Sequence, residues 1–226
     1  MTVVTVAVDS NVDAARTFAE ATHETHPSLV DPEQRLVELL GLTNVPLATW
    51  IDESGRIVRL ADTAYGAARA DATPVDEETR RKQAEQARAA EERMTPAQRE
   101  VRQHLAAAVD RSGRYEDAIR DWAKRGAGSP YVLTERQVVE RSRPRAPEVA
   151  MAAAEFALAQ HLQRSGDGRD AVAHYKEAHR LDPRGWTYLR QALAAADPDW
   201  GQVYERDMMS EIAVVGADTF YSPLEL

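Results

Sequence analysis

The sequence predicts an α/β segment followed by an all-α region, the class α/β plus all-α. Near the start, the almost wholly β-branched run Val3–Val8 precedes a helical pattern and then a strand–turn–strand pattern. From Thr95 onward, apolar residues recur at helical spacing and alanine is frequent among them. A strongly polar stretch separates the two patterns. We therefore expect an α/β unit over residues 1–66, a polar helical linker over 67–94, a helical domain over 95–200, and a C-terminal helix with a docking tail over 201–226.

Composition excludes several function classes. The chain has 226 residues, with 28 Lys plus Arg against 37 Asp plus Glu and a formal charge of -9. Such a balance argues against general nucleic-acid binding, which depends on neutralising phosphates. The sequence contains no cysteine, so it forms no disulfide, thiolate metal site or thiol nucleophile. No apolar run is long enough to span a membrane and no signal peptide is evident, so we expect a cytoplasmic protein without a membrane partner.

The first elements follow from local patterns. Val3–Val8 reads as a buried parallel strand that ends at Asp9, and a helix capped by Asn11 or Asp13 should follow. Asp31 should cap a second, short helix over Pro32–Leu40, with the proline in its first position.

An antiparallel hairpin completes the α/β unit. Residues 45–52 read as a strand, Glu53-Ser54-Gly55-Arg56 as a tight turn, and residues 57–60 as the partner strand.

This order of elements resembles the C-terminal half of a thioredoxin-like domain, closest to the peroxiredoxin-type and thiol-disulfide-oxidoreductase group. The motifs that carry the resemblance are the strand ending at Asp9, Leu29-Val30-Asp31-Pro32, Gly41-Leu42-Thr43-Asn44-Val45-Pro46 and the hairpin from Ile51 to Val58. It covers about residues 2–66. The resemblance implies that Pro46 is the family cis-proline, and hence that the Val45–Pro46 peptide bond is cis.

The departure from this family concerns its reactive centre. Family members place a central strand and a redox Cys-x-x-Cys, or a lone peroxidatic cysteine, before the strand that matches Val3–Val8. The resemblance implies a gap between that strand and Leu47–Ile51. Three ways of filling the gap stay open: direct pairing of the two strands, a strand from another copy of the chain, or a domain that extends upstream of Met1.

The linker and the start of the helical domain have clear local signals. Residues 67–94 contain almost no large apolar side chain, and Glu77/Arg81 and Glu78/Lys82 are spaced as helical ion pairs. Thr95-Pro96-Ala97-Gln98 reads as a helix start, with threonine as the cap and glutamine reaching back to the cap backbone.

Ala152–Pro183 resembles a tetratricopeptide (TPR) repeat, a helix–turn–helix unit of 34 residues. The matching positions are Leu158, Ala159, Leu162, Gly166, Ala171, Tyr175, Ala178 and Pro183. An earlier hairpin over Leu105–Trp122 matches less well, an insertion follows over Ala127–Pro147, and a third helix over Trp186–Ala195 should stack on the second hairpin. The resemblance covers roughly residues 97–196. The whole chain resembles a bacterial group that joins a peroxiredoxin-type domain to C-terminal TPR helices.

Few residues qualify as site candidates, and we predict no catalytic, cofactor or metal site. A protein-binding groove is placed at Leu158, Leu162 and Tyr175, with burial in the core as the competing interpretation. His23 and His26 are interpreted as a solvated helix end rather than a metal pair. Strand-end and turn carboxylates are interpreted as turn formers, and the arginine cluster as paired with the chain's own carboxylates. The carboxylates are Asp9, Asp52 and Glu53, and the arginine cluster is Arg136, Arg141, Arg143 and Arg145. The tail Asp218–Leu226 should dock on the protein.

The function expected from these features is a redox-inactive thioredoxin-like/TPR protein that binds a protein or peptide through its helices, without a cofactor. The alternative is the cysteine-less C-terminal portion of a thiol-disulfide oxidoreductase or peroxiredoxin-like antioxidant protein. The oligomeric state stays open, with a dimer among the options.

Overall fold

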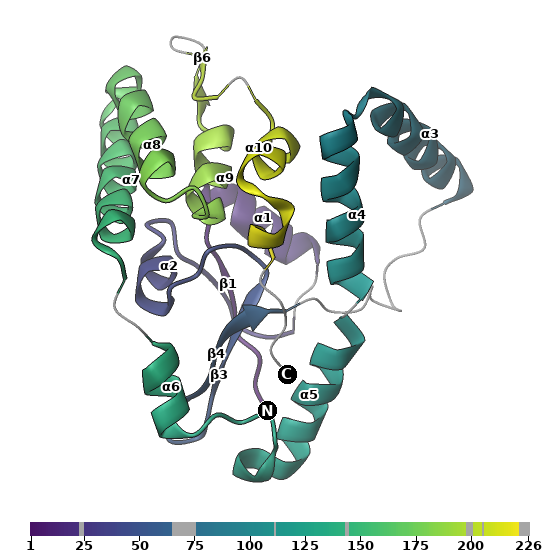
Figure 1. The fold of residues 1–226 in the computed structure, drawn as a ribbon, viewed down its shortest axis with the longest axis vertical. Coiled ribbons are helices and arrows are strands. Elements are labelled where there is room, and N and C mark those ends of the chain that lie inside the picture. Colours follow the sequence, from purple (N-terminus) through teal and green to yellow (C-terminus); the bar gives the residue numbers. More distant parts are fainter. Residues whose placement is uncertain are drawn as a thin grey trace.

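The computed structural model describes residues 1–22, 25–64, 76–110, 112–142, 145–197, 201–204 and 206–221. Within them the chain is mostly helical, with three small two-stranded sheets (Figure 1). A mixed α/β and helical class is therefore confirmed.

The strands form three separate pairs. They are β1 (Thr5–Ala7), β2 (Ser28–Val30), β3 (Leu47–Ile51), β4 (Ile57–Thr63), β5 (Ala196–Asp197) and β6 (Gly201–Gln202). β1 pairs with β2 in parallel, while β3–β4 and β5–β6 are antiparallel. The predicted hairpin is confirmed, with Gly55 at φ +80° in its turn. The sequence did not predict β2, because three residues before Asp-Pro carry too little pattern.

The helices account for most of the fold. They are α1 (Val12–Ala21), α2 (Arg35–Leu40), α3 (Glu77–Arg93), α4 (Pro96–Asp110), α5 (Ser112–Arg125), α6 (Glu135–Arg141), α7 (Pro147–Ser165), α8 (Gly168–Leu181), α9 (Trp186–Ala194) and α10 (Met208–Val215). Two 3-10 turns, η1 (Gly126–Gly128) and η2 (Ala217–Thr219), follow α5 and α10.

Local capping explains where several helices begin. The Asn11 side chain accepts from the Ala14 N–H at the start of α1, and Thr95 and Gln98 exchange side-chain-to-backbone hydrogen bonds at the start of α4, both as predicted. The start of α2 is a correction. Asp31 Oδ2 accepts from the Leu36 N–H at 2.7 Å, and Gln34 has φ +54°, so the helix begins at Arg35 rather than at Pro32.

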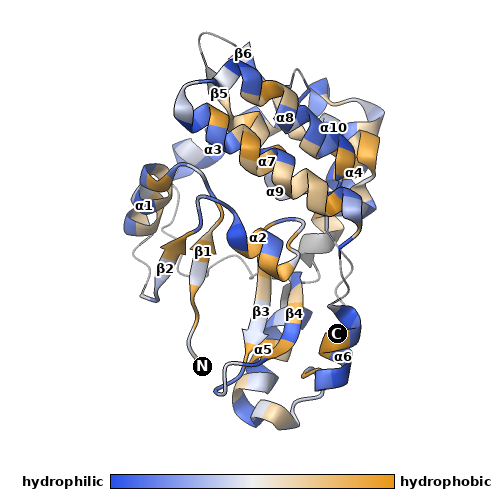
Figure 2. Ribbon diagram, turned by 90° about the vertical axis from the view of Figure 1, so that its left-hand side faces the viewer, coloured by the Kyte–Doolittle hydropathy of each residue, from blue (hydrophilic) through white to orange (hydrophobic). Residues whose placement is uncertain are grey.

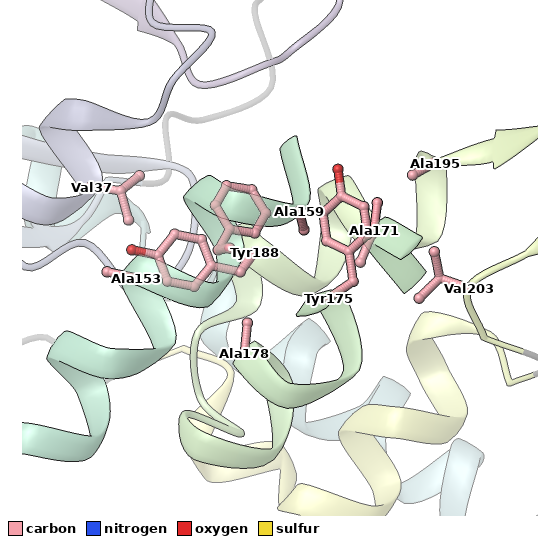
Figure 3. Close-up of a cluster of buried hydrophobic side chains, with 11 residues drawn as sticks. Val37, Ala153, Ala159, Ala171, Tyr175, Ala178, Tyr188, Ala195 and Val203 are labelled. Carbon is pink, nitrogen blue, oxygen red and sulfur yellow. The ribbon is translucent and has the colours of Figure 1, made fainter. Parts of the chain in front are cut away.

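The main core lies around the hairpin of α7 and α8 (Figure 3). Alanines on the facing sides, Ala159 and Ala171, are fully buried and let the two helices approach closely. The Phe156 ring stacks on Tyr188 of α9 with centroids 4.3 Å apart, which confirms that the third helix packs on this hairpin. Val37 of α2 belongs to the same cluster.

The N-terminal α/β segment has no hydrophobic cluster of its own among the described residues. Val37 is buried against α7–α9, and Trp50 of β3 is buried against Tyr115 and Ala118 of α5. The segment and the helices therefore share their cores.

The helices between the linker and α7 are not arranged as the repeat pattern predicts. α4 packs on α10, and α5 continues below α4 instead of folding back beside it (Figure 1). The physical reason is a set of contacts between aromatic side chains of α5 and Trp50 of β3. The Trp122 and Trp50 rings stack with centroids 4.8 Å apart, and the Tyr115 hydroxyl accepts a hydrogen bond from the Trp50 indole N–H. Because of these contacts, α5 buries its apolar side on the β3–β4 hairpin. Thus Leu105–Trp122 does not form a hairpin.

Candidate functional site

The candidate site is the division between the two N-terminal sheets. In Figure 2 the strands lie in the order β2, β1, β3, β4, and within the described residues β1 pairs with β2 alone and β3 with β4 alone. The direct pairing of β1 with β3, one of the three ways of filling the gap, is not found there.

Strand geometry shows which backbone groups face this division. Thr5 N–H donates to Pro27 O at 3.0 Å, and Asp31 N–H donates to Ala7 O at 2.8 Å, so the backbone of Thr5 and Ala7 faces β2. Because alternate residues of a strand face opposite partners, the backbone of Val4 and Val6 faces away from β2, toward β3.

One end of the division is closed by α9. Gln191 Nε2 donates to Val8 O at 3.4 Å, and its Oε1 accepts from the Ser10 N–H and hydroxyl. Nothing in the sequence singled out Gln191, because a polar residue on a helix gives no sign that it will cap a distant strand.

The side chains around the division are apolar and exposed. Val3, Val4 and Ile51 are 49%, 52% and 53% exposed. β1 itself is only half-buried, so the prediction of a buried strand is wrong in this respect. A strand with a bare edge and apolar neighbours is a template for another strand.

A half-open pocket lies at the other end of the division. It is lined by Met1, Thr2, Ile51, Asp52, Glu53, Trp122, Ala123 and Gly126. Asp52 is engaged in the hairpin turn, where the Ser54 hydroxyl and the backbone of Arg56 hold the pKa of its carboxyl below the ordinary value. Asp9 likewise accepts from the Asn11 N–H, so the interpretation of these two carboxylates as turn formers is confirmed. The described residues contain no group of three side chains suited to hold a metal.

The loop before β3 connects this site to the rest of the molecule. The Val45–Pro46 peptide bond is cis, as the resemblance implies, and Pro46 O accepts from the Ala64 N–H at 3.1 Å. Next to it, the Asn44 side chain is buried, donates to Phe220 O and accepts from Arg190. Asn44 is a second residue that no sequence pattern singles out.

The three residues of the predicted groove, Leu158, Leu162 and Tyr175, do not share one exposed surface. Tyr175 is 2% exposed, and burial raises the pKa of its hydroxyl to about 12. Leu162 packs against the same cluster, whereas Leu158 is exposed and lies outside it. The core interpretation holds for Leu162 and Tyr175.

The neighbouring face of α7 is covered by the chain itself. Phe156 lies under Tyr188, and Gln160 is buried with its Nε2 donating to Pro32 O at 3.3 Å.

The remaining candidates have internal partners or lie outside the described residues. His26 Nε2 lies 3.2 Å from Thr5 Oγ1, while His23 is outside the described residues. Arg136 pairs with Glu140 and Arg145 donates to Val37 O, which supports internal pairing of the arginine cluster. Arg141 also interacts within the chain, and Arg143 is outside the described residues.

The comparisons with known proteins return no matching family model, curated protein or solved structure. Among the described residues, no helix has the length and apolar character to cross a membrane. The thioredoxin-like and TPR assignments therefore stay predictions from the sequence.

Proposed function

We propose that this chain is a redox-inactive, thioredoxin-like/TPR protein-interaction module that takes up an extended segment of a partner between β1 and β3. The observation that carries the proposal is the facing pair of strand edges, flanked by exposed Val3, Val4 and Ile51. Strand addition satisfies backbone donors and acceptors on both sides of the inserted segment, and exposed apolar side chains add affinity. The α7–α8 hairpin serves as a support for this site.

The absence of cysteine supports a binding role over a catalytic one. Thiol–disulfide exchange requires a thiolate, and the chain has none. We expect no insulin reduction and no peroxide consumption by the purified chain.

The test compares capture of partners by wild-type protein with capture by two edge variants, Val4→Lys and Ile51→Lys. Both side chains are exposed, so the fold tolerates the change, and a lysine on a strand edge opposes strand addition. Val139→Lys on α6, where the valine is 67% exposed, is the matched control. We expect one set of proteins, identified by mass spectrometry, to be retained by wild type and the control and lost from both edge variants. Equal capture by all four proteins contradicts the proposal.

A second candidate is favoured by the position of the division. The family would place its cysteine-bearing strand there, so the chain is then the C-terminal portion of a thiol-disulfide oxidoreductase or peroxiredoxin-like protein whose reactive strand lies on another segment. Reading the coding DNA ahead of Met1 tests this candidate. An in-frame, strand-like sequence with a redox cysteine supports it, and the lack of one rules out an upstream source.

A further inference from the structure

The C-terminal segment lies in a pocket where the α/β segment meets the helices. The Phe220 side chain is 4% exposed and packs with Val101, Trp186, Leu189 and Ile212. Docking of the tail is thereby confirmed for Phe220, and Tyr221 packs against the same cluster. Residues 222–226 lie outside the described residues.

The side chains around this segment bind both its backbone and the aromatic ring of Phe220. Asn44 Nδ2 donates to Phe220 O at 2.5 Å, and Trp186 Nε1 donates to Thr219 O at 3.1 Å. The Arg190 guanidinium lies 5.4 Å from the centroid of the Phe220 ring, and Trp186 meets that ring edge-on. Side chains of the loop before β3 and of α9 thus contact two successive backbone carbonyls and the Phe220 ring.

The fit leaves donors unused. Within the described residues, Arg190 Nε and Thr187 Oγ1 are buried without a hydrogen-bond partner. Thr187 lies beside the same loop, since its N–H donates to Thr43 O. The tail therefore leaves these two buried donors without a partner.

A glycine with positive φ precedes the segment that carries Phe220. Gly216, at φ +117°, separates α10 from η2, and a side chain there would meet Asp218 Oδ1 at 2.8 Å.

We propose that this pocket is a peptide-binding site for segments of the Thr-Phe-Tyr type, and that the chain's own residues 217–221 fill it in cis as a displaceable strap. The ligand class is a peptide with an aromatic side chain whose own and preceding carbonyls accept hydrogen bonds. The site is separate from the β1–β3 edges and does not rest on the function proposed for them.

The experiment measures binding of a fluorescent peptide with the sequence of residues 214–221 to the full-length chain by fluorescence anisotropy. A tethered strap competes at a high effective concentration, so wild type should bind weakly. Phe220→Leu keeps an apolar side chain but loses the ring contacts, which weakens the strap. We expect the peptide to bind Phe220→Leu at least about tenfold more tightly than wild type.

Asn44→Asp in the Phe220→Leu background tests the pocket itself. The carboxylate retains the contact with Arg190 but removes the amide donor to the peptide carbonyl, so binding should fall at least about tenfold. If Phe220→Leu does not fold, as judged by circular dichroism, Tyr221→Ala replaces it with the same readout. Equal binding to wild type and the strap variant, or binding that ignores Asn44→Asp, overturns the proposal. The Val4→Lys variant binds the peptide as wild type does, so failure here and failure of the strand-edge proposal are distinguishable.

Discussion

At the scale of single residues, Trp50 links the α/β segment to α5. It is 3% exposed, its indole N–H donates to the Tyr115 hydroxyl at 2.9 Å, and the Arg59 guanidinium lies 5.5 Å from its ring. The sequence predicts that Trp50 lies on a strand. It does not reveal that Tyr115 and Trp122 of α5 cover it, because those contacts depend on how a distant helix is placed.

Tyr115→Phe removes a single hydroxyl group, but it should lower the stability of the protein measurably. It leaves the buried indole N–H without its acceptor, so we expect the free energy of unfolding to fall by about 1–3 kcal/mol. Urea denaturation checks this, with Tyr131→Phe, at the edge of the same cluster, as the control. Equal effects of the two substitutions contradict the role given to the hydroxyl.

The buried tyrosines predict how the stability of the protein changes at alkaline pH. Burial raises the pKa of Tyr175 and of Tyr188 to about 12, and both groups ionise near pH 10 when unfolded. The stability that they contribute is therefore fully present below about pH 10 and is lost as the pH rises toward about 12. Thermal melts across this range, with tyrosinate absorbance recorded in parallel, measure the effect. Ionisation of all the tyrosines near pH 10 with no loss of stability would contradict it.

At the scale of elements, local signals predicted helix starts and the hairpin, while packing decided the rest. Thr95 and Gln98 form their cap from neighbours alone, and the Glu78–Lys82 ion pair of α3 forms at 2.7 Å as expected. Arg81 instead pairs with Glu85. The repeat-like pattern of α4 and α5 predicted a hairpin that does not form. Apolar spacing predicts which face of a helix is buried, but it does not predict which element covers that face.

The close approach of α7 and α8 predicts a sharp positional contrast on α8. Ala171 is fully buried against α7, whereas Ala173, two residues along, is exposed. Ala171→Leu should cost about 1–3 kcal/mol by overpacking, and Ala173→Leu should cost less than about 0.5 kcal/mol. Comparable losses in chemical denaturation would show that the hairpin is not closely packed.

At the scale of the whole molecule, the two regions depend on each other. The buried residues that share clusters with Val37 and Trp50 all come from the helical region, so residues 1–64 expressed alone should not fold. We expect the intact chain to unfold in a single thermal transition, and the fragment to have the circular dichroism of an unfolded chain. A folded fragment, or two separate transitions of the intact chain, would contradict this mutual dependence.

The central claim, that β1 offers a bare edge toward β3, is tested most directly by residue-resolved hydrogen exchange of the isolated chain. The Val6 N–H faces the division, whereas the Thr5 and Asp31 N–H groups donate to Pro27 O and Ala7 O. We predict that the Val6 amide exchanges at least about tenfold faster than these two neighbours. Equal protection of Val6 would mean that this edge already has a partner, which contradicts the claim.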